Sequence, residues 1–461
     1  MFPKENYVQR RSALRKKLDS GIVILPGNSE SSMNYPANAF RFRQDSNFLY
    51  FFGLDHPDFI GVIDIDDQKD YLFGDDLDMD DIIWMGPQPS LHEMAMEVGV
   101  DETGPFGKAE EFIKGAIQKK RKIHLLPPYR GDTKLLLSQI TGIRPFNIDL
   151  WVSEPLIKAV IALRSYKDDL EIQEIEFAMD IAWEMHTTAM KMARTGVGER
   201  KIAGTIEGIA LARGNGVSFP IILSINGQTL HNHDHSNILE PGRMMITDAG
   251  AESMLHYASD ITRTVPVDGK FDQRQRDIYE IVLKANTETI RNIRPGVTNK
   301  NLHLMAARII TQGLKELGIM KGNADEAVSM GANALFFPHG LGHMMGLDVH
   351  DMEGLGENYV GYNDEFRRSE QFGLAYLRLA KKLEPGFVFT IEPGIYFIPP
   401  LFKQWRKEGK FTEFINYDKA EAYLDFGGIR IEDDVLVTGD GYRVLGKPIP
   451  KTADEIEAIM S

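Results

Sequence analysis

The sequence contains no cysteine in its 461 residues. This absence excludes disulfide bonds, thiolate zinc sites and a cysteine nucleophile. The hydrophobic fraction of 43% and the charged fraction of 26% are ordinary for a globular protein, so the composition does not indicate disorder.

Basic residues are outnumbered by acidic ones. There are 52 Lys and Arg against 67 Asp and Glu, which gives a formal net charge of −15. Phosphate binding needs clustered Lys and Arg, so neither nucleic acid nor an anionic membrane is expected as a partner. The opening segment MFPKENYVQRRSALRKKLDSG is charged and amphipathic and lacks a long apolar run. We therefore expect no signal peptide or membrane anchor, and a cytoplasmic location.

The length is sufficient for two domains. Residues 1–165 are predicted to form an α/β unit, in which a basic helix at about 6–19 precedes strands near 22–26, 59–65, 71–73 and 123–127. Residues 166–461 form the second predicted domain. It opens with a long helix near Asp168 whose apolar residues recur at helical spacing, and His186 near that face is interpreted as a structural histidine.

An internal similarity links two segments of the second domain. LEPGRMMITDAG (239–250) and LEPGFVFTIEPG (383–394) share the turn LEPG, a short β-run and an acid nine positions after the leucine. The Pro-Gly turn starts each strand, and each strand delivers one carboxylate, Asp248 or Glu392, at its end. Two related half-domains facing each other across a site would explain the similarity, although common Pro-Gly turns can also match by chance.

Acids and histidines gather in five short motifs. Asp248 ends a predicted strand in TDAG, and Asp260 follows twelve residues later in SDITRT, a spacing that suits two antiparallel strands joined by a loop. Arg430 and Glu432 in GIRIEDD share one face of an extended strand. The stretch HGLGHMMGLDVHD and the motif TIEPGIYF supply the remaining candidates, His339, His343, His350 and Glu392.

A carboxylate in an apolar run is costly unless it is paired or bound to metal. A salt bridge would explain any one of these acids alone, but Arg430 cannot neutralise four of them. Four carboxylates and one neutral imidazole carry a charge of about −4, which two divalent ions would balance. An oxygen-rich set with one histidine suits Mn²⁺ or Co²⁺ better than a structural zinc ion. Two such ions about 3.5–4 Å apart can lower the pKa of a shared water.

Together the five motifs resemble those of the aminopeptidase P and prolidase (Xaa-Pro dipeptidase) family of metallopeptidases. FRQDSNFLYFFG and IIWMGP resemble the family's N-terminal domain, so the resemblance covers nearly the whole chain. It implies an α+β protein, with a pita-bread catalytic domain of two pseudo-two-fold half-domains after a smaller α/β domain. It also implies hydrolysis of the bond between an N-terminal residue and proline, with two divalent ions, Mn(II) first and Co(II) or Zn(II) as alternatives.

The resemblance assigns roles to the motif residues. Asp260 and Glu432 would bridge the two ions, and Glu392 would also act as general base. His339 and His350 would polarise or hydrogen-bond the substrate and the tetrahedral intermediate. The implied metal ligands are Asp248, Asp260, His343, Glu392 and Glu432.

Four further residues acquire roles from the same resemblance. His231 would line the substrate pocket, and Arg430 would hold metal ligands in place. Arg378 matches a prolidase position that contacts the substrate carboxylate, although aminopeptidases also have an arginine close by. Trp84 matches a tryptophan presented to a neighbouring subunit's site, which implies a homodimer or homotetramer.

The chain departs from the family pattern in two places. The two aspartates are twelve residues apart where eleven is usual, so the hairpin tip near 253–256 must absorb one residue. Phe219 replaces a usual tyrosine and cannot donate its hydroxyl hydrogen bond. The alternating histidines of HNHDH (231–235) could share a face and bind a separate metal ion, but a polar loop at the pocket rim is the favoured interpretation.

Several functions remain open on the sequence. A non-catalytic peptide-binding module or a metal-free hydrolase of guanidino compounds would lack the metal ligands, and all five are present. A methionine aminopeptidase would not need the first 165 residues. Arg378 and the segment PPLFKQWRKEGKFTEF resemble prolidases, yet an aminopeptidase acting on longer peptides is preferred over a dipeptidase. Proline in the second position of a peptide gives a tertiary amide without N–H, which calls for a dedicated site.

Overall fold

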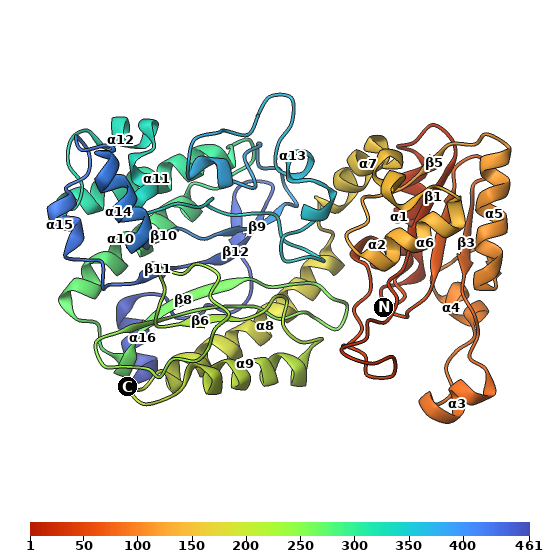
Figure 1. Ribbon diagram of the computed structural model, residues 1–461, viewed down its shortest axis with the longest axis horizontal. Coiled ribbons are helices and arrows are strands. Elements are labelled where there is room, and N and C mark those ends of the chain that lie inside the picture. Colours follow the sequence, from red (N-terminus) through yellow and green to blue (C-terminus); the bar gives the residue numbers. More distant parts are fainter. The chain divides into compact units, whose positions relative to one another are not determined.

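The computed structural model describes residues 1–461, which divide into two compact units, Met1–Arg164 and Ser165–Ser461. We call them the N-terminal unit and the C-terminal unit, and both are visible in Figure 1. None of the helices combines the length and the apolar character that crossing a membrane requires.

The N-terminal unit is a mixed five-stranded sheet with helices around it (Figure 1). The strand order is β4-β3-β2-β1-β5, in which β1–β2 and β2–β3 are antiparallel whereas β3–β4 and β1–β5 are parallel. Residues of β1, β2, α5 and α6 form a common buried apolar core. The elements are α1 (Lys4–Arg15), β1 (Ile22–Pro26), α2 (Ser46–Phe52), β2 (Ile60–Asp64), β3 (Lys69–Phe73), α3 (Met79–Met85), α4 (Leu91–Glu97), β4 (Glu102–Gly104), α5 (Phe106–Gln118), β5 (Ile123–His124), α6 (Gly131–Thr141), η1 (Pro145–Trp151) and α7 (Glu154–Arg164).

The mixed sheet expected from the sequence is present, but its last strand is shorter than predicted. β5 ends at His124, and Leu125 forms only an isolated bridge with Val152. Pro127 and Pro128 follow, and because proline has no N–H the predicted strand at 123–127 cannot continue as a ladder.

The C-terminal unit contains three small sheets rather than one large one. Their strand orders are β6-β7-β8, β13-β12-β9 and β10-β11. The long helix expected near Asp168 is confirmed as α8. It begins there because the Asp168 carboxylate caps it by accepting from the N–H groups of Leu170 and Glu171. The elements are α8 (Asp169–Met192), α9 (Glu199–Arg213), β6 (Ile222–Ser224), β7 (Met244–Ala249), β8 (Ile261–Pro266), η2 (Val267–Gly269), α10 (Gln273–Arg291), α11 (Asn299–Glu316), α12 (Ala324–Met330), η3 (Ala332–Leu335), η4 (Glu353–Leu355), α13 (Glu357–Val360), η5 (Leu374–Tyr376), β9 (Val388–Ile391), β10 (Gly394–Tyr396), α14 (Pro399–Glu408), α15 (Tyr417–Glu421), β11 (Gly428–Arg430), β12 (Asp433–Val437), β13 (Tyr442–Val444) and α16 (Ala453–Met460).

The two LEPG segments occupy equivalent places in two half-domains. In the first half, α8 and α9 pack on each other beside β6 and β7, and in the second α10 and α11 pack beside β9. Leu239 exchanges backbone hydrogen bonds with the Gly196–Val197 turn at 2.9 and 2.8 Å, and Leu383 does the same with the Gly296–Val297 turn at 2.8 and 2.8 Å. The internal similarity therefore reflects repeated structure and not a chance match of turns.

The first half-domain brings the two aspartates together by a hairpin. β7 and β8 pair antiparallel, with Asp248 opposite Thr262, and Asp260 directly precedes β8. Asp248 and Asp260 are thus diagonal neighbours on one face, as the spacing predicted. The tip of the connection turns at His256, whose φ is +66°, and its N–H bonds the Ser253 carbonyl at 3.0 Å.

In the second half-domain each glutamate stands where a strand passes from one sheet to another. β9 and β12 pair with Ile391 opposite Asp433, and β10 and β11 pair with Gly394 opposite Arg430. Pro393 interrupts the ladder because it has no N–H to donate. The N–H of Glu392 instead donates to Leu341 at 2.8 Å, and the N–H of Glu432 donates to Thr262 at 3.1 Å.

Candidate active site

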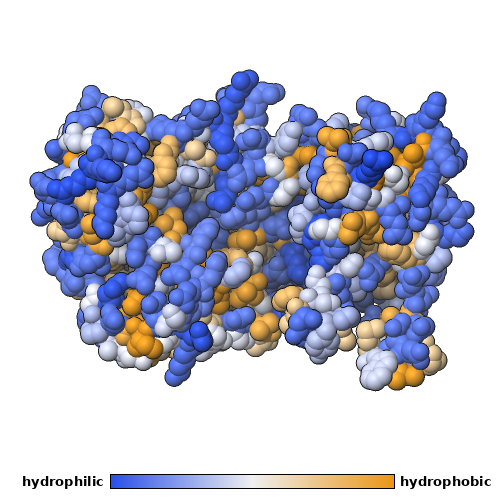
Figure 2. Space-filling view, viewed as in Figure 1, coloured by the Kyte–Doolittle hydropathy of each residue, from blue (hydrophilic) through white to orange (hydrophobic).

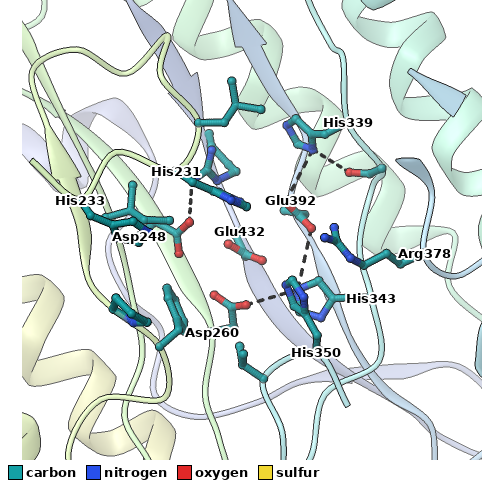
Figure 3. A pocket seen from close by; sticks show the side chains of 17 residues that line it. His231, His233, Asp248, Asp260, His339, His343, His350, Arg378, Glu392 and Glu432 are labelled. Atoms are coloured by element: carbon teal, nitrogen blue, oxygen red, sulfur yellow. Dashed lines mark hydrogen bonds and ion pairs between the residues drawn. The ribbon is translucent and has the colours of Figure 1, made fainter. Parts of the chain in front are cut away.

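A cavity of about 210 Å³ lies between the two half-domains, and seventeen residues line it (Figure 3). Its lining contains all the sequence-predicted site residues except Trp84, and it also contains His233 and Phe219. The site residues lining the cavity are His231, Asp248, Asp260, His339, His343, His350, Arg378, Glu392, Arg430 and Glu432.

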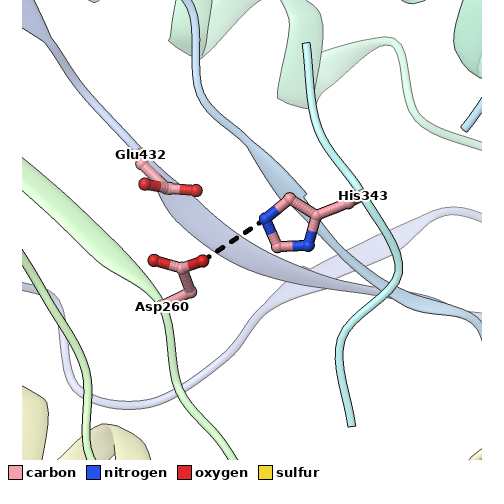
Figure 4. Close-up of side chains that lie close together, drawn as sticks. All are labelled: Asp260, His343 and Glu432. Carbon is pink, nitrogen blue, oxygen red and sulfur yellow. Dashed lines mark ion pairs between the residues drawn. The ribbon is translucent and has the colours of Figure 1, made fainter. Parts of the chain in front are cut away.

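Three of the predicted ligands already form a compact donor group (Figure 4). Ligand atoms of Asp260, His343 and Glu432 lie within 4.8 Å of one another. His343 Nδ1 lies 3.1 Å from the Met344 carbonyl, which can only accept, so Nδ1 carries the proton and Nε2 presents its lone pair. His343 Nε2 is 3.3 Å from Asp260 Oδ2 and 3.9 Å from Glu392 Oε1, which directs that lone pair at the carboxylates.

The acids are too close together and too deeply buried to be ionised at once. Burial raises the pKa of Glu392 to about 8, and the neighbouring Asp260 and Asp248 add to the rise against the opposing charge of Arg430. Burial, followed by repulsion from neighbouring carboxylates, also raises the pKa values of Asp260 and Glu432 well above their usual range. A divalent cation among them would reverse this balance.

A second observation, the unpaired oxygen atoms of two aspartates, also indicates that the donor set suits metal ions. The Oδ1 atoms of Asp248 and Asp260 are buried and have no hydrogen-bond partner. Buried polar atoms are nearly always satisfied, so two orphaned carboxylate oxygens in one cavity need a ligand. Oxygen donors with one imidazole nitrogen are suited to hard or borderline divalent ions. The residues that could hold such ions are Asp248, Asp260, His343, Glu392 and Glu432.

Arg430 organises one wall of the site. Its guanidinium donates to Asp248 Oδ2 at 2.6 Å, to the Tyr396 hydroxyl at 2.7 Å and to Thr262 Oγ1 at 3.0 Å. The Thr262 hydroxyl in turn donates to Glu432 Oε2 at 2.6 Å. The ion pair expected for a buried acid therefore exists for Asp248, and the Arg430 guanidinium pairs with none of the other predicted acidic ligands.

The two histidines beside the acids are held neutral. Burial lowers the pKa of His339 to about 3 and that of His350 to about 4. His339 Nδ1 lies 2.8 Å from the Gly340 carbonyl, its Nε2 lies 2.9 Å from the Tyr396 hydroxyl, and Glu392 Oε2 is 3.6 Å from Nδ1. His350 Nδ1 lies 2.6 Å from Glu353 Oε2, so this nitrogen carries the proton and Nε2 remains an acceptor.

The HNHDH stretch does not converge on a separate metal site. His231 and His233 line the cavity, and burial lowers the pKa of His231. His235 Nε2 bonds the Ile221 carbonyl at 3.1 Å instead. His186 is 1% exposed and its Nε2 bonds the Ala249 carbonyl at 2.9 Å, which agrees with the structural interpretation.

Trp84 lies outside the cavity of its own chain. It is 86% exposed on α3 of the N-terminal unit, a helix with no buried residue. Met79, Ile83 and Met85 of the same helix are also exposed, and Figure 2 shows apolar side chains gathered on this projecting segment.

Several residues that complete the site were not found from the sequence. Tyr396 bridges His339 and Arg430, and Asp434 accepts the N–H of Asp260 at 3.0 Å. Glu353 bonds His350, and a glutamate three positions after a histidine on a turn was a detectable signal. Tyr396 and Asp434 lie within the recognised motifs TIEPGIYF and GIRIEDD, but only the tertiary pairing of the strands reveals their partners.

Fold and site together define a metal-dependent peptidase. A family model described as metallopeptidase family M24 matches residues 173–439, and one described as the aminopeptidase P N-terminal domain matches residues 7–125. The chain belongs to metallopeptidase family M24 and has the pita-bread fold that the sequence motifs implied.

Relatives within that family have two activities in their names. A Xaa-Pro dipeptidase from Homo sapiens is 32% identical over 450 residues, which cover 95% of this chain and 88% of that protein. A probable Xaa-Pro aminopeptidase from Uncinocarpus reesii is 31% identical and covers 100% of this chain and 94% of that one. The solved structure of aminopeptidase P from E. coli in its low pH form aligns with a TM-score of 0.81 at 28% identity, over 100% of this chain and 98% of that one.

Proposed function

We propose that this protein is a metallo-exopeptidase that hydrolyses the bond between an N-terminal residue and a following proline, and that it acts as a Xaa-Pro aminopeptidase. The convergence on a single cavity of one imidazole and four carboxylates, three of them buried and that of Glu392 partly buried, carries the proposal. A Xaa-Pro dipeptidase restricted to dipeptides is the alternative, because curated relatives have either name.

Two divalent ions would be held by Asp248, Asp260, His343, Glu392 and Glu432. The oxygen-rich donor set favours Mn(II), with Co(II) and Zn(II) as the alternatives. When bound, the ions would supply Lewis acidity, which lowers the pKa of water and polarises the scissile carbonyl. Arg430 would keep Asp248 in place through its 2.6 Å contact.

The chain's own residues then handle the protons. Glu392 lines the cavity, and its Oε2 lies beside His339, so we assign it as the general base that accepts a proton from the attacking water. The same carboxyl can deliver that proton to the proline nitrogen when the bond breaks. His350 is neutral and presents Nε2 as an acceptor for a substrate N–H.

The apolar part of the cavity suits a proline ring. Phe219, Pro220, Leu230 and Val349 line it beside the acids. An apolar wall gains free energy by covering the ring methylenes. The tertiary amide of proline presents no N–H, so this wall needs no acceptor for one. Phe219, which replaces the tyrosine usual in the family and so lacks its hydroxyl, forms part of this apolar wall.

The test is hydrolysis of a Xaa-Pro dipeptide and a Xaa-Pro-Xaa tripeptide by the Mn(II)-loaded protein, with Glu392→Gln as the control. Cleavage of the tripeptide by the parent protein and not by the variant supports the aminopeptidase. Cleavage of the dipeptide alone makes the protein a dipeptidase. Failure to cleave either substrate, or equal activity of the variant, overturns the proposed mechanism.

We further propose that the protein is a homodimer or homotetramer in which Trp84 faces a neighbouring subunit. The exposed apolar side chains of α3 support this proposal because such a surface is unfavourable in water. Light scattering of the parent protein and of Trp84→Ser tests it. A monomeric parent protein would contradict it.

A further inference from the structure

Two guanidinium groups line the cavity, and they differ in their surroundings. Arg430 is 3% exposed and is committed to Asp248, Tyr396 and Thr262. Arg378 is the cation that remains for a substrate carboxylate, and Figure 3 shows its guanidinium extending toward the acids.

Two carboxylates contact the Nε atom of Arg378. Its Nε lies 3.2 Å from Glu353 Oε2 and 3.2 Å from Glu357 Oε1. Glu357 also pairs with Arg368 through its other oxygen. The cluster thus contains two negative and two positive charges. If the charge of Glu357 is assigned to Arg368, the charge of Glu353 balances that of Arg378.

Glu353 is held in this place by the site itself. It is the first residue of η4, three positions after His350, and its Oε2 accepts from His350 Nδ1 at 2.6 Å. The side chains of Glu353 and Arg378 are 39% and 32% exposed, so their attraction is only partly screened by water. A small space bounded by His343, His350, Glu353 and Arg378 adjoins the cavity.

We propose that Glu353 is a specificity-determining residue, which balances the charge of Arg378 and so removes the advantage of a substrate whose proline carries a free carboxylate. The inference rests on the proposed Xaa-Pro hydrolysis. A dipeptide places a full negative charge next to its proline, whereas a longer peptide places a neutral amide there. A balanced Arg378 still donates hydrogen bonds to an amide carbonyl, but it offers little net charge to a carboxylate.

The experiment uses the Mn(II)-loaded full chain and three substrates, Ala-Pro, its C-terminal amide and Ala-Pro-Ala. Glu353→Gln removes the charge while keeping an oxygen that accepts from His350. We expect the kcat/KM for Ala-Pro, taken relative to that for its amide and for the tripeptide, to rise about fivefold to tenfold through a lower KM for Ala-Pro, because any loss through His350 is common to all three substrates. Glu365→Gln, which removes an exposed carboxylate paired with Lys382 at 2.9 Å, is the matched control and should change none of the three.

The remaining outcomes overturn the inference. Equal changes for Ala-Pro and its amide would show that Glu353 acts only through His350 or on stability. No change for any substrate would show that Arg378 is not balanced by it. If the parent protein cleaves none of the three, the proposed function itself fails, which is a different result from an active enzyme with an unaltered ratio.

A second variant keeps the inference testable if Glu353→Gln does not fold. With Glu353 present, Arg378→Gln should lower kcat/KM for Ala-Pro and for its amide by the same factor, because the guanidinium acts as a hydrogen-bond donor. A loss confined to the free acid would mean that Arg378 acts through an unbalanced charge, and would contradict the proposal.

Discussion

Glu392 and Glu432 stand directly opposite each other in one strand register. The pairs Ile391–Asp433 and Gly394–Arg430 belong to two different sheets, yet they keep the same register across the break between them. Like charges at opposite positions destabilise a strand pair. The break at Pro393 therefore lies where the fold places two acids opposite each other, and either protonation or a bound cation would relieve their repulsion.

Glu432→Gln should stabilise the metal-free protein and weaken metal binding. Burial and the neighbouring acids raise the pKa of Glu432, so folding at neutral pH must neutralise a carboxyl that is ionised in the unfolded chain. We expect the free energy of unfolding in EDTA to rise by about 1–3 kcal/mol, measured by urea denaturation. In excess Mn(II) the parent protein should be the more stable of the two. A variant less stable in EDTA would contradict the role of repulsion, and the exposed Glu421→Gln serves as control.

Arg430→Met should weaken metal binding without abolishing the fold. The change leaves Asp248 Oδ2 without its donor and frees Tyr396 and Thr262. Residues that orient metal ligands typically contribute 10–100-fold in affinity, so we expect Mn(II) binding by calorimetry to weaken by about that factor. Arg443→Met, which removes a surface ion pair with Glu176, should leave the affinity unchanged. Equal affinities for all three proteins would rule out the positioning role.

His303 should make the folded state sensitive to acid between pH 6.5 and 4. It is 3% exposed and packs against the Phe337 ring at 5.2 Å, and burial lowers its pKa from 6.5 to about 4. Below pH 6.5 the unfolded chain takes up a proton that the folded chain refuses, so stability falls until the folded pKa is reached and then levels off. The contribution is about 3 kcal/mol.

Urea denaturation of the parent protein and of His303→Leu at several pH values measures this effect. The difference between the two curves should grow in favour of the variant as the pH falls from 6.5 to 4. The exposed His92→Leu, which removes a histidine at the surface, is the matched control. A pH-independent gap for His303→Leu would show that its protonation is not linked to folding.

Gly242→Ala and Gly386→Ala should destabilise the protein to a similar extent. The two glycines occupy the equivalent turns of the LEPG repeat, with φ of +76° and +93°. An added Cβ meets no atom within 4 Å at Gly242 and only ordinary contacts with Tyr166 at Gly386, so the cost is conformational. We expect about 1–2 kcal/mol for each in thermal or urea unfolding. Gly439→Ala, at an open position without a positive φ, should cost much less, and an equal loss there would contradict the argument.

The ligand motifs could be predicted because they are local. TDAG and SDITRT indicate a hairpin whose ends carry acids, and the structure pairs those strands antiparallel. The LEPG repeat indicated two half-domains, and equivalent hydrogen bonds at Leu239 and Leu383 explain why the repeat is visible in the sequence.

The rest depends on distant segments and was not visible along the chain. In the sequence, little distinguishes Glu353, Tyr396 and Asp434 from other polar residues. Their roles depend on tertiary contacts, such as the pairing of β10 with β11 and the contact of Arg378 with η4. GIRIEDD was expected to act as one strand, but it crosses from one sheet to another because its partner strand contains Pro393. The shorter β5 has the same origin, since the prolines at 127 and 128 outweigh the apolar pattern.

The shared register of Glu392 and Glu432 fixes the length of the strand segment around Glu392 but does not fix the length of the connector between β10 and β11. Inserting or deleting one residue between Val388 and Tyr396 would turn Glu392 to the opposite face of its strand. The connector from β10 to β11, residues 397–427 with α14 and α15, can change length without altering that register, because loop closure depends only weakly on length. The facing positions of the two acids thus follow from the paired residues on either side of Pro393, and not from the length of the connector.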